Sequence, residues 1–242
     1  MDLADDVAVA RLAIAVLDLT DLAEPTDAAA ADRLCARARA AGVAAVCVWP
    51  EYVALCVDRL AGTGVRVATV VNFPTGDFPA DDVIELARHC VADGADEVDV
   101  VLPYRAWLAG DITHATAVLD GVDAVAPTVK VIIESGELPD RAAIDRATLF
   151  AIAHGADFVK TSTGKTPTSA TPEAAEIILE AIAMSGEAVG FKASGGVRTL
   201  DDARRYLRIA EDTMGAGWVS PATFRFGASG LLDALEPVAA GG

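Results

Sequence analysis

Phe158-Val-Lys-Thr-Ser-Thr-Gly-Lys-Thr166 is the stretch from which the fold can be read. It begins with apolar residues, as the end of a buried strand does, and then places Lys160 among small hydroxyl residues. Gly164 and Lys165 follow, so the strand passes into a polar loop that contains a glycine. An amine at a strand end, followed by a glycine and a second amine, suits covalent attack on a carbonyl beside an anion site.

The simpler alternative is a strand that ends in solvated lysines. Lysine is scarce here, however, because the chain has only four, Lys130, Lys160, Lys165 and Lys192, against 15 arginines. A chain that uses arginine for nearly all of its positive charge has kept lysine where arginine cannot replace it. Of the two side chains, only an amine can lose its proton near neutral pH and form a Schiff base. The scarcity favours a chemical role for Lys160.

On both sides of this stretch, short apolar runs alternate with helical segments. The runs predicted to be strands are residues 12–17, 43–48, 65–71, 97–101, 129–133, a sixth that begins at 158, 188–192 and 223–226. Strands alternating with helices imply parallel βαβ units, and eight such units in about 240 residues predict a closed (β/α)8 TIM barrel. We expect one α/β domain over residues 1–242. The alternative, an open doubly wound sheet, needs a G-x-G-x-x-G after the first strand, and Leu17-Asp-Leu-Thr-Asp21 has none.

The charge and composition of the chain exclude several classes of partner. With a net charge of −17, the chain has no basic stretch that could bind nucleic acid or an anionic membrane. No uncharged run exceeds about a dozen residues, which is too short for a membrane span. The four cysteines show no C-x-x-C spacing and the three histidines lie far apart, so we expect reduced thiols and no metal site. The acidic start is unlike a signal peptide, and we expect a cytoplasmic protein.

In a barrel of this kind, the chemistry takes place on the loops after the strands. Lys160 and Lys192 end neighbouring strands, so they lie roughly 5 Å apart by strand spacing. Two amines that close repel each other, and one can lose its proton near neutral pH. Asp99, between valines on the fourth strand, is expected to reach both lysines through water and to transfer protons. The alternative for Asp99 is an ion pair with an arginine.

Three glycine-containing loops follow strands six, seven and eight. They are Gly164-Lys165, Gly195-Gly-Val-Arg198 and Gly227-Ala-Ser-Gly230. Glycines let backbone N–H groups approach an anion closely, and the N-terminus of a helix adds its dipole. The last two loops form the usual phosphate site of TIM barrels. We therefore expect an anion site in these loops.

These motifs resemble those of the deoxyribose-phosphate aldolase family. The segments that carry the resemblance are Val70-Val-Asn-Phe-Pro-Thr-Gly76, Glu97-Val-Asp-Val-Val-Leu-Pro-Tyr104, Val129-Lys-Val-Ile-Ile-Glu134, Phe158-Val-Lys-Thr-Ser-Thr-Gly-Lys-Thr166, Gly190-Phe-Lys-Ala-Ser-Gly-Gly-Val-Arg198 and Arg225-Phe-Gly-Ala-Ser229. The resemblance implies a class I aldolase that needs no metal and no cofactor. It also implies cleavage of 2-deoxy-D-ribose 5-phosphate to D-glyceraldehyde 3-phosphate and acetaldehyde.

The resemblance also implies roles for individual residues. The Schiff-base lysine falls on Lys160, the second lysine on Lys192 and the proton-relay aspartate on Asp99. The expected substrate contacts are Asp18, Thr20, Cys47, Thr163, Gly164, Lys165, Gly195, Gly196, Arg198, Gly227 and Ser229. The chain departs from the family at Gly230, where many members have a second serine.

The expected partners are small phosphosugar and aldehyde substrates, and we expect a homo-oligomer, either a dimer or a tetramer. Two other functions fit the same fold. A phosphosugar isomerase would use a carboxylate such as Glu134 as its base, which leaves the two lysines unexplained. A non-catalytic sugar-phosphate-binding barrel would keep the glycine loops and would not need Asp99.

Overall fold

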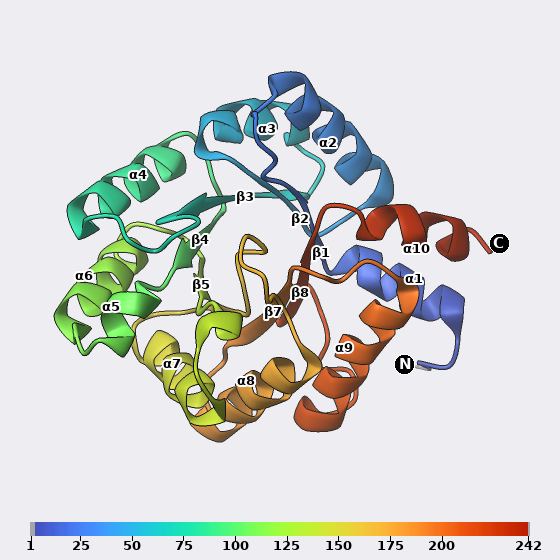
Figure 1. Cartoon of the computed structure of the whole chain (residues 1–242). Helices are drawn as coiled ribbons and strands as arrows, with labels where there is room; N and C mark the ends of the chain where they lie inside the picture. The colour runs from blue at the N-terminus through green and yellow to red at the C-terminus, as the bar shows by residue number, and fades with distance from the viewer. Residues whose placement is uncertain (1–2, 242) are drawn as a thin grey trace.

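Eight parallel strands close into a barrel in the order β1 to β8, with β8 paired back to β1. Figure 1 looks along the barrel, with the helices arranged around it. The computed structural model describes residues 3–241, so residues 1, 2 and 242 of the expected domain lie outside the described residues. The strands are β1 (Leu17–Asp21), β2 (Ala45–Val48), β3 (Arg66–Val71), β4 (Glu97–Val101), β5 (Val129–Ile132), β6 (Phe158–Lys160), β7 (Gly190–Ser194) and β8 (Phe224–Ala228). The (β/α)8 TIM barrel predicted from the sequence is confirmed.

Helices connect successive strands and cover the outside of the barrel. The α-helices are α1 (Asp6–Ala15), α2 (Ala28–Ala41), α3 (Val53–Leu60), α4 (Ala80–Ala92), α5 (Tyr104–Leu108), α6 (Ile112–Asp123), α7 (Arg141–Ala153), α8 (Pro172–Ser185), α9 (Leu200–Met214) and α10 (Leu231–Ala239). Two short 3₁₀ helices, η1 (Pro50–Tyr52) and η2 (Ser135–Glu137), follow β2 and β5. Asp27 is the N-cap of α2, because its carboxylate accepts a hydrogen bond from the amide of Ala29 at 2.9 Å.

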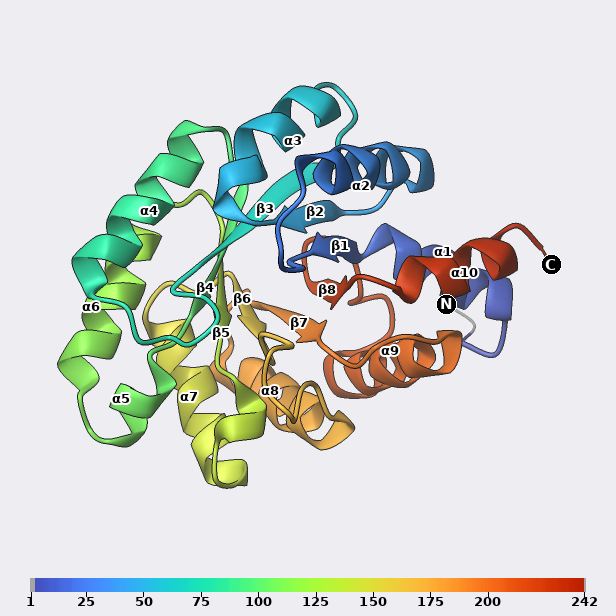
Figure 2. The ribbon, with the colours of Figure 1, turned by 45° about the horizontal axis from the view of Figure 1, so that its top comes forward.

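The predicted strand at residues 12–17 is wrong, because α1 extends to Ala15 and β1 begins only at Leu17. A short apolar run does not distinguish a buried strand from the buried face of a helix. Residues Val9, Ala10, Ala13 and Ile14 recur at helical spacing and are buried. Figures 1 and 2 show α1 packed beside α10 and α9, near the end of the described chain. The chain therefore adds one helix before the first strand of the barrel.

The register of the strands brings charged residues together inside the barrel. Lys160 on β6 pairs with Lys192 on β7, which pairs in turn with Arg225 on β8. Asp99 on β4 pairs with Lys130 on β5. In parallel strands, residues that are register partners point to the same side of the sheet. The register alone thus directs five charged side chains into the barrel.

Among residues 3–241, none of the helices combines the length and apolar character needed to cross a membrane.

Candidate active site

Seven charged side chains occupy the barrel interior, and we refer to them as the interior charge cluster. Its members are Asp18, Glu97, Asp99, Lys130, Lys160, Lys192 and Arg225. No member has more than 2% of its surface exposed. Burial at this depth is unfavourable for a charge unless a partner of opposite sign lies against it. The contacts within the cluster therefore determine whether it is stable.

Asp99 lies at the centre of this cluster. Its Oδ2 accepts hydrogen bonds from the Nζ atoms of Lys160 and Lys192, each at 2.8 Å, and its Oδ1 accepts one from Lys130 at 2.8 Å. The water-mediated contact expected from the sequence is therefore wrong. Because the sheet closes into a barrel, side chains two or three strands apart converge at its centre and touch directly. The alternative of an arginine partner for Asp99 is also wrong, because all three partners are lysines.

The two strand-end lysines are in different electrostatic situations. Burial lowers the pKa of Lys160, the Asp99 carboxylate opposes this, and the charge of Lys192 lowers it further, so that the net shift is downward. Burial also acts to lower the pKa of Lys192, but the carboxylates of Asp18 and Asp99 outweigh it and raise that pKa. Lys192 consequently keeps its proton, and Lys160 is the amine that can be neutral.

The remaining members form the floor of the cluster. Arg225 donates from Nη1 to Oδ1 of Asp18 at 2.5 Å and from Nη2 to Oε1 of Glu97 at 2.8 Å. The Nζ of Lys130 lies 2.6 Å from Oε2 of Glu97, and Lys192 donates to Oδ2 of Asp18 at 2.5 Å. The Arg225 guanidinium also lies over the ring of Phe158, 5.4 Å from its centroid. Each carboxylate of the cluster thus contacts at least two basic groups.

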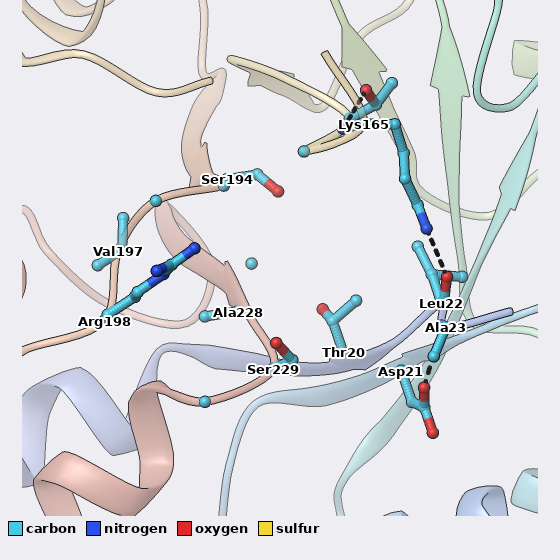
Figure 3. Close-up of a pocket in the computed structure, with 16 residues that line it drawn as sticks. Thr20, Asp21, Leu22, Ala23, Lys165, Ser194, Val197, Arg198, Ala228 and Ser229 are labelled. Atoms are coloured by element: carbon cyan, nitrogen blue, oxygen red, sulfur yellow. Dashed lines mark hydrogen bonds between the residues drawn. The ribbon is translucent and has the colours of Figure 1, made fainter. Parts of the chain in front are cut away.

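A cavity with a volume of ≈ 540 Å³ opens at the C-terminal ends of β1, β6, β7 and β8 (Figure 3). We refer to it as the loop pocket. It is lined by Thr20, Asp21, Leu22, Ala23, Thr163, Gly164, Lys165, Ser194, Gly195, Gly196, Val197, Arg198, Gly227, Ala228, Ser229 and Gly230. Residues 164–165, 195–198 and 227–230 of this lining are the loops in which the sequence predicted an anion site, and the end of β1 adds residues 20–23.

The loop pocket lies directly beyond the interior charge cluster along the strands. Ser194 is two residues after Lys192 on β7, and Gly227 is two residues after Arg225 on β8. Residues two apart on a strand share one face, so the pocket lining continues the row of interior side chains. A ligand whose anionic group lies in the loop pocket would therefore extend toward Lys160.

Four positions around the loop pocket require glycine for structural reasons. Gly164, Gly195 and Gly196 have φ of +78°, +82° and +84°, a region that side chains with a Cβ rarely adopt. Gly227 has an ordinary φ, but a Cβ there would lie 2.8 Å from Oγ of Ser194 and 3.0 Å from Cε of Lys192. These glycines let the backbone approach a ligand and leave room for the catalytic candidate Lys192.

Two cations flank the loop pocket without a carboxylate partner among the described residues. Lys165 donates from Nζ to the carbonyl oxygen of Leu22 at 2.7 Å, and Figure 3 shows Arg198 on the opposite side. Neither side chain forms an ion pair within residues 3–241, although the chain carries a net charge of −17. Their charge is available to an anionic ligand; Asp21 also lines the pocket, and its carboxylate accepts a hydrogen bond from the amide of Ala23 at 3.2 Å.

Glu134, the possible base of an isomerase, follows β5 and is buried. Its carboxylate accepts hydrogen bonds from the amide of Thr163 at 3.3 Å, the hydroxyl of Thr163 at 2.5 Å and the hydroxyl of Thr166 at 3.2 Å. Burial raises its pKa, and these hydrogen bonds oppose the rise. Its backbone φ of 49° is unusual for a residue with a side chain. Glu134 thus anchors the loop after β6, and its oxygens are occupied by that loop.

The residues predicted from the sequence fall into two groups. Lys160, Asp99 and Lys192 come together in the interior charge cluster, together with Asp18. The loop pocket is lined by Thr20, Thr163, Gly164, Lys165, Gly195, Gly196, Arg198, Gly227 and Ser229. Cys47 is buried on β2, where it is the register partner of Thr20, and neither Cys47 nor Asp18 lines the loop pocket.

Sequence reasoning did not assign roles to Glu97, Lys130 and Arg225. A signal for them was present, because each lies on a predicted strand, and Lys130 and Arg225 each interrupt an apolar run. A charged residue flanked by apolar ones in a central strand predicts a buried ion pair. Across residues 3–241, the histidine, cysteine and acidic side chains form no group of three or more that could hold a metal ion.

Comparison with known proteins agrees with this geometry. A family model described as DeoC/LacD family aldolase matches residues 12–236. The chain is 47% identical over 242 residues to the deoxyribose-phosphate aldolase of Agrobacterium fabrum (strain C58 / ATCC 33970), covering 96% of this chain and 92% of that protein. A solved "putative deoxyribose-phosphate aldolase" from Coccidioides immitis superimposes with a TM-score of 0.83 at 30% identity, covering 95% of this chain and 86% of that one.

A deoxyribose phosphate aldolase structure from Aeropyrum pernix, described as tetrameric, superimposes with a TM-score of 0.79, covering 97% of each chain. Its identity is 22%, so this similarity concerns the fold alone. The family match spans nearly the whole barrel, and the match to the Agrobacterium relative covers almost its entire length. The family-model match and the identity to the Agrobacterium relative both show that this chain belongs to the DeoC/LacD aldolase family.

Proposed function

We propose that this chain is a deoxyribose-phosphate aldolase that reversibly cleaves 2-deoxy-D-ribose 5-phosphate through a Schiff base on Lys160. The observation that carries the proposal is the pair of lysines sharing Asp99, in which Lys160 has a lowered pKa and Lys192 a raised one. A nucleophilic amine needs this lowered pKa. The adjoining loop pocket, with Lys165 and Arg198, supports a phosphorylated substrate.

The first steps build the electron sink. Neutral Lys160 attacks the C1 aldehyde of the open-chain sugar, and loss of water gives an iminium. Asp99 takes the C3 hydroxyl proton through a water molecule, with Lys192 nearby. The C2–C3 bond then breaks, its electron pair moves toward the iminium nitrogen, and D-glyceraldehyde 3-phosphate leaves. No metal or organic cofactor takes part in this scheme, because the iminium accepts the electrons.

The last steps regenerate the enzyme. The enamine left on Lys160 is protonated at C2 by the proton that Asp99 took from the C3 hydroxyl, relayed through water, which restores the iminium. Water then adds to C1, acetaldehyde leaves, and the free amine of Lys160 returns. The water lost when the iminium forms is consumed again when it is hydrolysed, and the proton taken from the C3 hydroxyl returns at C2.

The loop pocket is proposed to bind the phosphate. Lys165, Arg198 and the amides of the loops at Gly164, Gly195, Gly196, Gly227 and Ser229 would surround it, with the N-terminus of α10 behind. Thr20, Thr163, Asp18 and Cys47 are proposed to contact the sugar, the last two from deeper in the barrel. The charge on the phosphate would then be matched by the two cations without carboxylate partners among the described residues.

The two alternatives receive less support. An isomerase would need a free base, and the Glu134 carboxylate is occupied by Thr163 and Thr166. A non-catalytic binding protein has no use for a buried lysine with a lowered pKa. Borohydride reduction in the presence of deoxyribose 5-phosphate, followed by mass spectrometry of peptides, separates all three. A tag on Lys160 supports the aldolase; a tag on Lys130 alone, or no tag, would contradict it.

Arginine is the matched replacement for that experiment. Lys160→Arg keeps a long cationic side chain, but a guanidinium stays protonated and cannot form the iminium. This variant should lose essentially all turnover and all borohydride tagging. Lys165→Arg keeps a cation at the loop pocket and is the control, since it should still be tagged on Lys160.

We also propose that the chain forms a homo-oligomer in the cytoplasm. Support comes from five large apolar side chains that are more than a third exposed on the α4–α7 side of the barrel, Phe78, Leu86, Leu108, Ile112 and Leu149. All four cysteines are free thiols, which suits a reducing compartment. Light scattering coupled to gel filtration measures the assembly directly.

A further inference from the structure

The charges of the interior charge cluster do not balance when all its members are ionised. The cluster contains three carboxylates, Asp18, Glu97 and Asp99, and four basic groups, Lys130, Lys160, Lys192 and Arg225. If Lys160 is neutral, three negative charges face three positive ones, whereas a protonated Lys160 leaves one uncompensated positive charge. In a buried site, an uncompensated charge is strongly unfavourable. The composition of the cluster therefore favours the neutral form of Lys160.

The floor of the cluster contributes to this balance although it does not touch Lys160. Arg225 contacts Asp18, whose other oxygen contacts Lys192, and Lys192 shares Asp99 with Lys160. Glu97 is linked to the same carboxylate through Lys130, at 2.6 Å and 2.8 Å. Among the described residues, Arg225 makes no hydrogen bond or ion pair with Lys160; its polar contacts are Asp18, Glu97 and the carbonyl oxygen of Pro221.

We propose that Glu97 and Arg225 are positioning residues of the reaction, which hold Lys160 in its neutral, nucleophilic form by fixing the charge balance from the floor of the barrel. This inference rests on the proposed Schiff-base function of Lys160. It assigns a catalytic consequence to two residues that the proposed mechanism does not use. An arginine at position 225 suits this role, because a guanidinium cannot lose its proton and its positive charge is therefore fixed.

Three other titratable groups lie near the interior charge cluster but outside its buried ion pairs. Cys47, on β2, is buried, and burial raises the pKa of its thiol, so it stays uncharged. Glu134, after β5, is bonded to Thr163 and Thr166 and forms no ion pair with a basic group of the described chain. Burial raises the pKa of Glu134, while its hydrogen bonds to Thr163 and Thr166 and the charge of Lys160 act to lower it. Arg66 reaches Glu97 at 3.2 Å from outside, but its side chain is 54% exposed and therefore screened by solvent.

The charges of the interior charge cluster predict the direction in which the pKa of Lys160 moves in each variant. Loss of the Arg225 charge leaves the cluster negative when Lys160 is neutral, so protonation of Lys160 becomes more favourable and its pKa rises. Loss of the Glu97 charge has the opposite effect and lowers the pKa of Lys160 further. A unit charge roughly 10 Å away, at the effective dielectric constant of protein sites, shifts a pKa by about one unit.

The experiment compares the acid limb of the kcat/KM profile in wild type and four variants. Arg225→Met should move the limb to higher pH and Glu97→Gln to lower pH, each by about half to one pH unit. The double variant Glu97→Gln/Arg225→Met removes one charge of each sign and should return the limb to within about 0.3 unit of wild type. Arg225→Lys keeps the charge and should leave the limb in place.

Structural damage would lower activity in both single variants. It would not move the acid limb in opposite directions in the two single variants and restore it in the double variant. Limbs that stay fixed, or that move the same way in both variants, would overturn the proposal. If Arg225→Met fails to fold, Glu97→Gln decides by itself, because a limb that rises or stays fixed contradicts the count. If neither single variant folds, the double variant decides. An acid limb far from that of wild type would contradict the proposed charge balance.

Two further measurements separate this inference from the function on which it rests. Borohydride trapping in wild type tests the Schiff base, so an absent tag means that the proposed function has failed. A tag on Lys160 together with unmoved limbs means that only the charge-balance inference has failed. Arg66→Met removes the exposed contact to Glu97 and should leave the limb nearly unchanged; a shift as large as that of Arg225→Met would show that the effect is not specific to the buried cluster.

Discussion

Lys160 and Lys192 are register partners on adjacent strands, and both donate to the same oxygen of Asp99 at 2.8 Å. Their pKa values are nevertheless shifted in opposite directions. Burial, which acts on both, is overcome for Lys192 by its second carboxylate, Asp18, but is not overcome for Lys160. One extra carboxylate therefore distinguishes the lysine that stays charged from the lysine that can attack a carbonyl.

Replacing Lys192 should reveal this division of roles. In Lys192→Leu, Lys160 loses the neighbouring positive charge that helps to lower its pKa, so its pKa rises. The acid limb of kcat/KM should move to higher pH by about one to two units. The measurement is a pH–rate profile with deoxyribose 5-phosphate. A fully active Lys192→Leu enzyme with an unmoved limb would refute the electrostatic role.

Replacing Asp99 should have the opposite effect on the limb. The Asp99 carboxylate raises the pKa of Lys160, so Asp99→Asn should move the acid limb to lower pH. Carbon–carbon cleavage should also slow by about 10²–10⁴-fold, because the proton acceptor is lost. Borohydride should still tag Lys160 in this variant. Asp212→Asn, on α9 and away from the barrel interior, is the control and should match wild type in both rate and limb.

Gly230 offers a test of the phosphate site. It has a negative φ of −109° and precedes α10, and a Cβ added there would meet no atom within 4 Å, so a serine fits without strain. A hydrogen bond to a charged group contributes about 1.5–3 kcal/mol when buried and less in an open pocket. Gly230→Ser should therefore lower KM for deoxyribose 5-phosphate several-fold and leave KM for deoxyribose unchanged. Steady-state kinetics with the two sugars measures both values.

A matched comparison is available at Gly196, which also lines the loop pocket but has a φ of +84°. Serine there adds a hydroxyl at the cost of backbone strain, so Gly196→Ser should raise KM for the phosphorylated sugar. Equal changes in KM for both sugars in Gly230→Ser would mean that this position does not contact the phosphate. The phosphate site would then depend on the loops after β6 and β7.

The acidic surface leads to a prediction about salt. With a net charge of −17, mutual repulsion opposes the folded state, and salt screens it as the Debye length falls to about 3 Å at 1 M. The melting temperature should rise between low and molar NaCl. Thermal unfolding followed by circular dichroism measures this change. A melting temperature that stays flat or falls would show that the surface charges already compensate one another.

The sequence by itself determined the alternation of strands and helices, and with it the barrel. Its apolar runs have the period and spacing of βαβ units, and local chain physics is sufficient to place most of them. The exception is residues 12–17, whose apolar run predicts a strand because such a run looks the same in a strand and on a buried helix face. The helix is capped locally by Asp5, and its buried face packs against α9 and α10, which a pattern of apolar residues alone does not reveal.

For the site, the sequence identified the chemical groups and the tertiary structure decided their partners. Lysine scarcity pointed to Lys160 and Lys192, and glycine pointed to the pocket loops, because these residue types carry distinctive chemistry wherever they lie. The direct contacts of Asp99, and the roles of Lys130, Glu97 and Arg225, depend on how far the closed sheet brings distant strands together. Contact across a barrel is set by its curvature and register, which no local pattern of residues encodes.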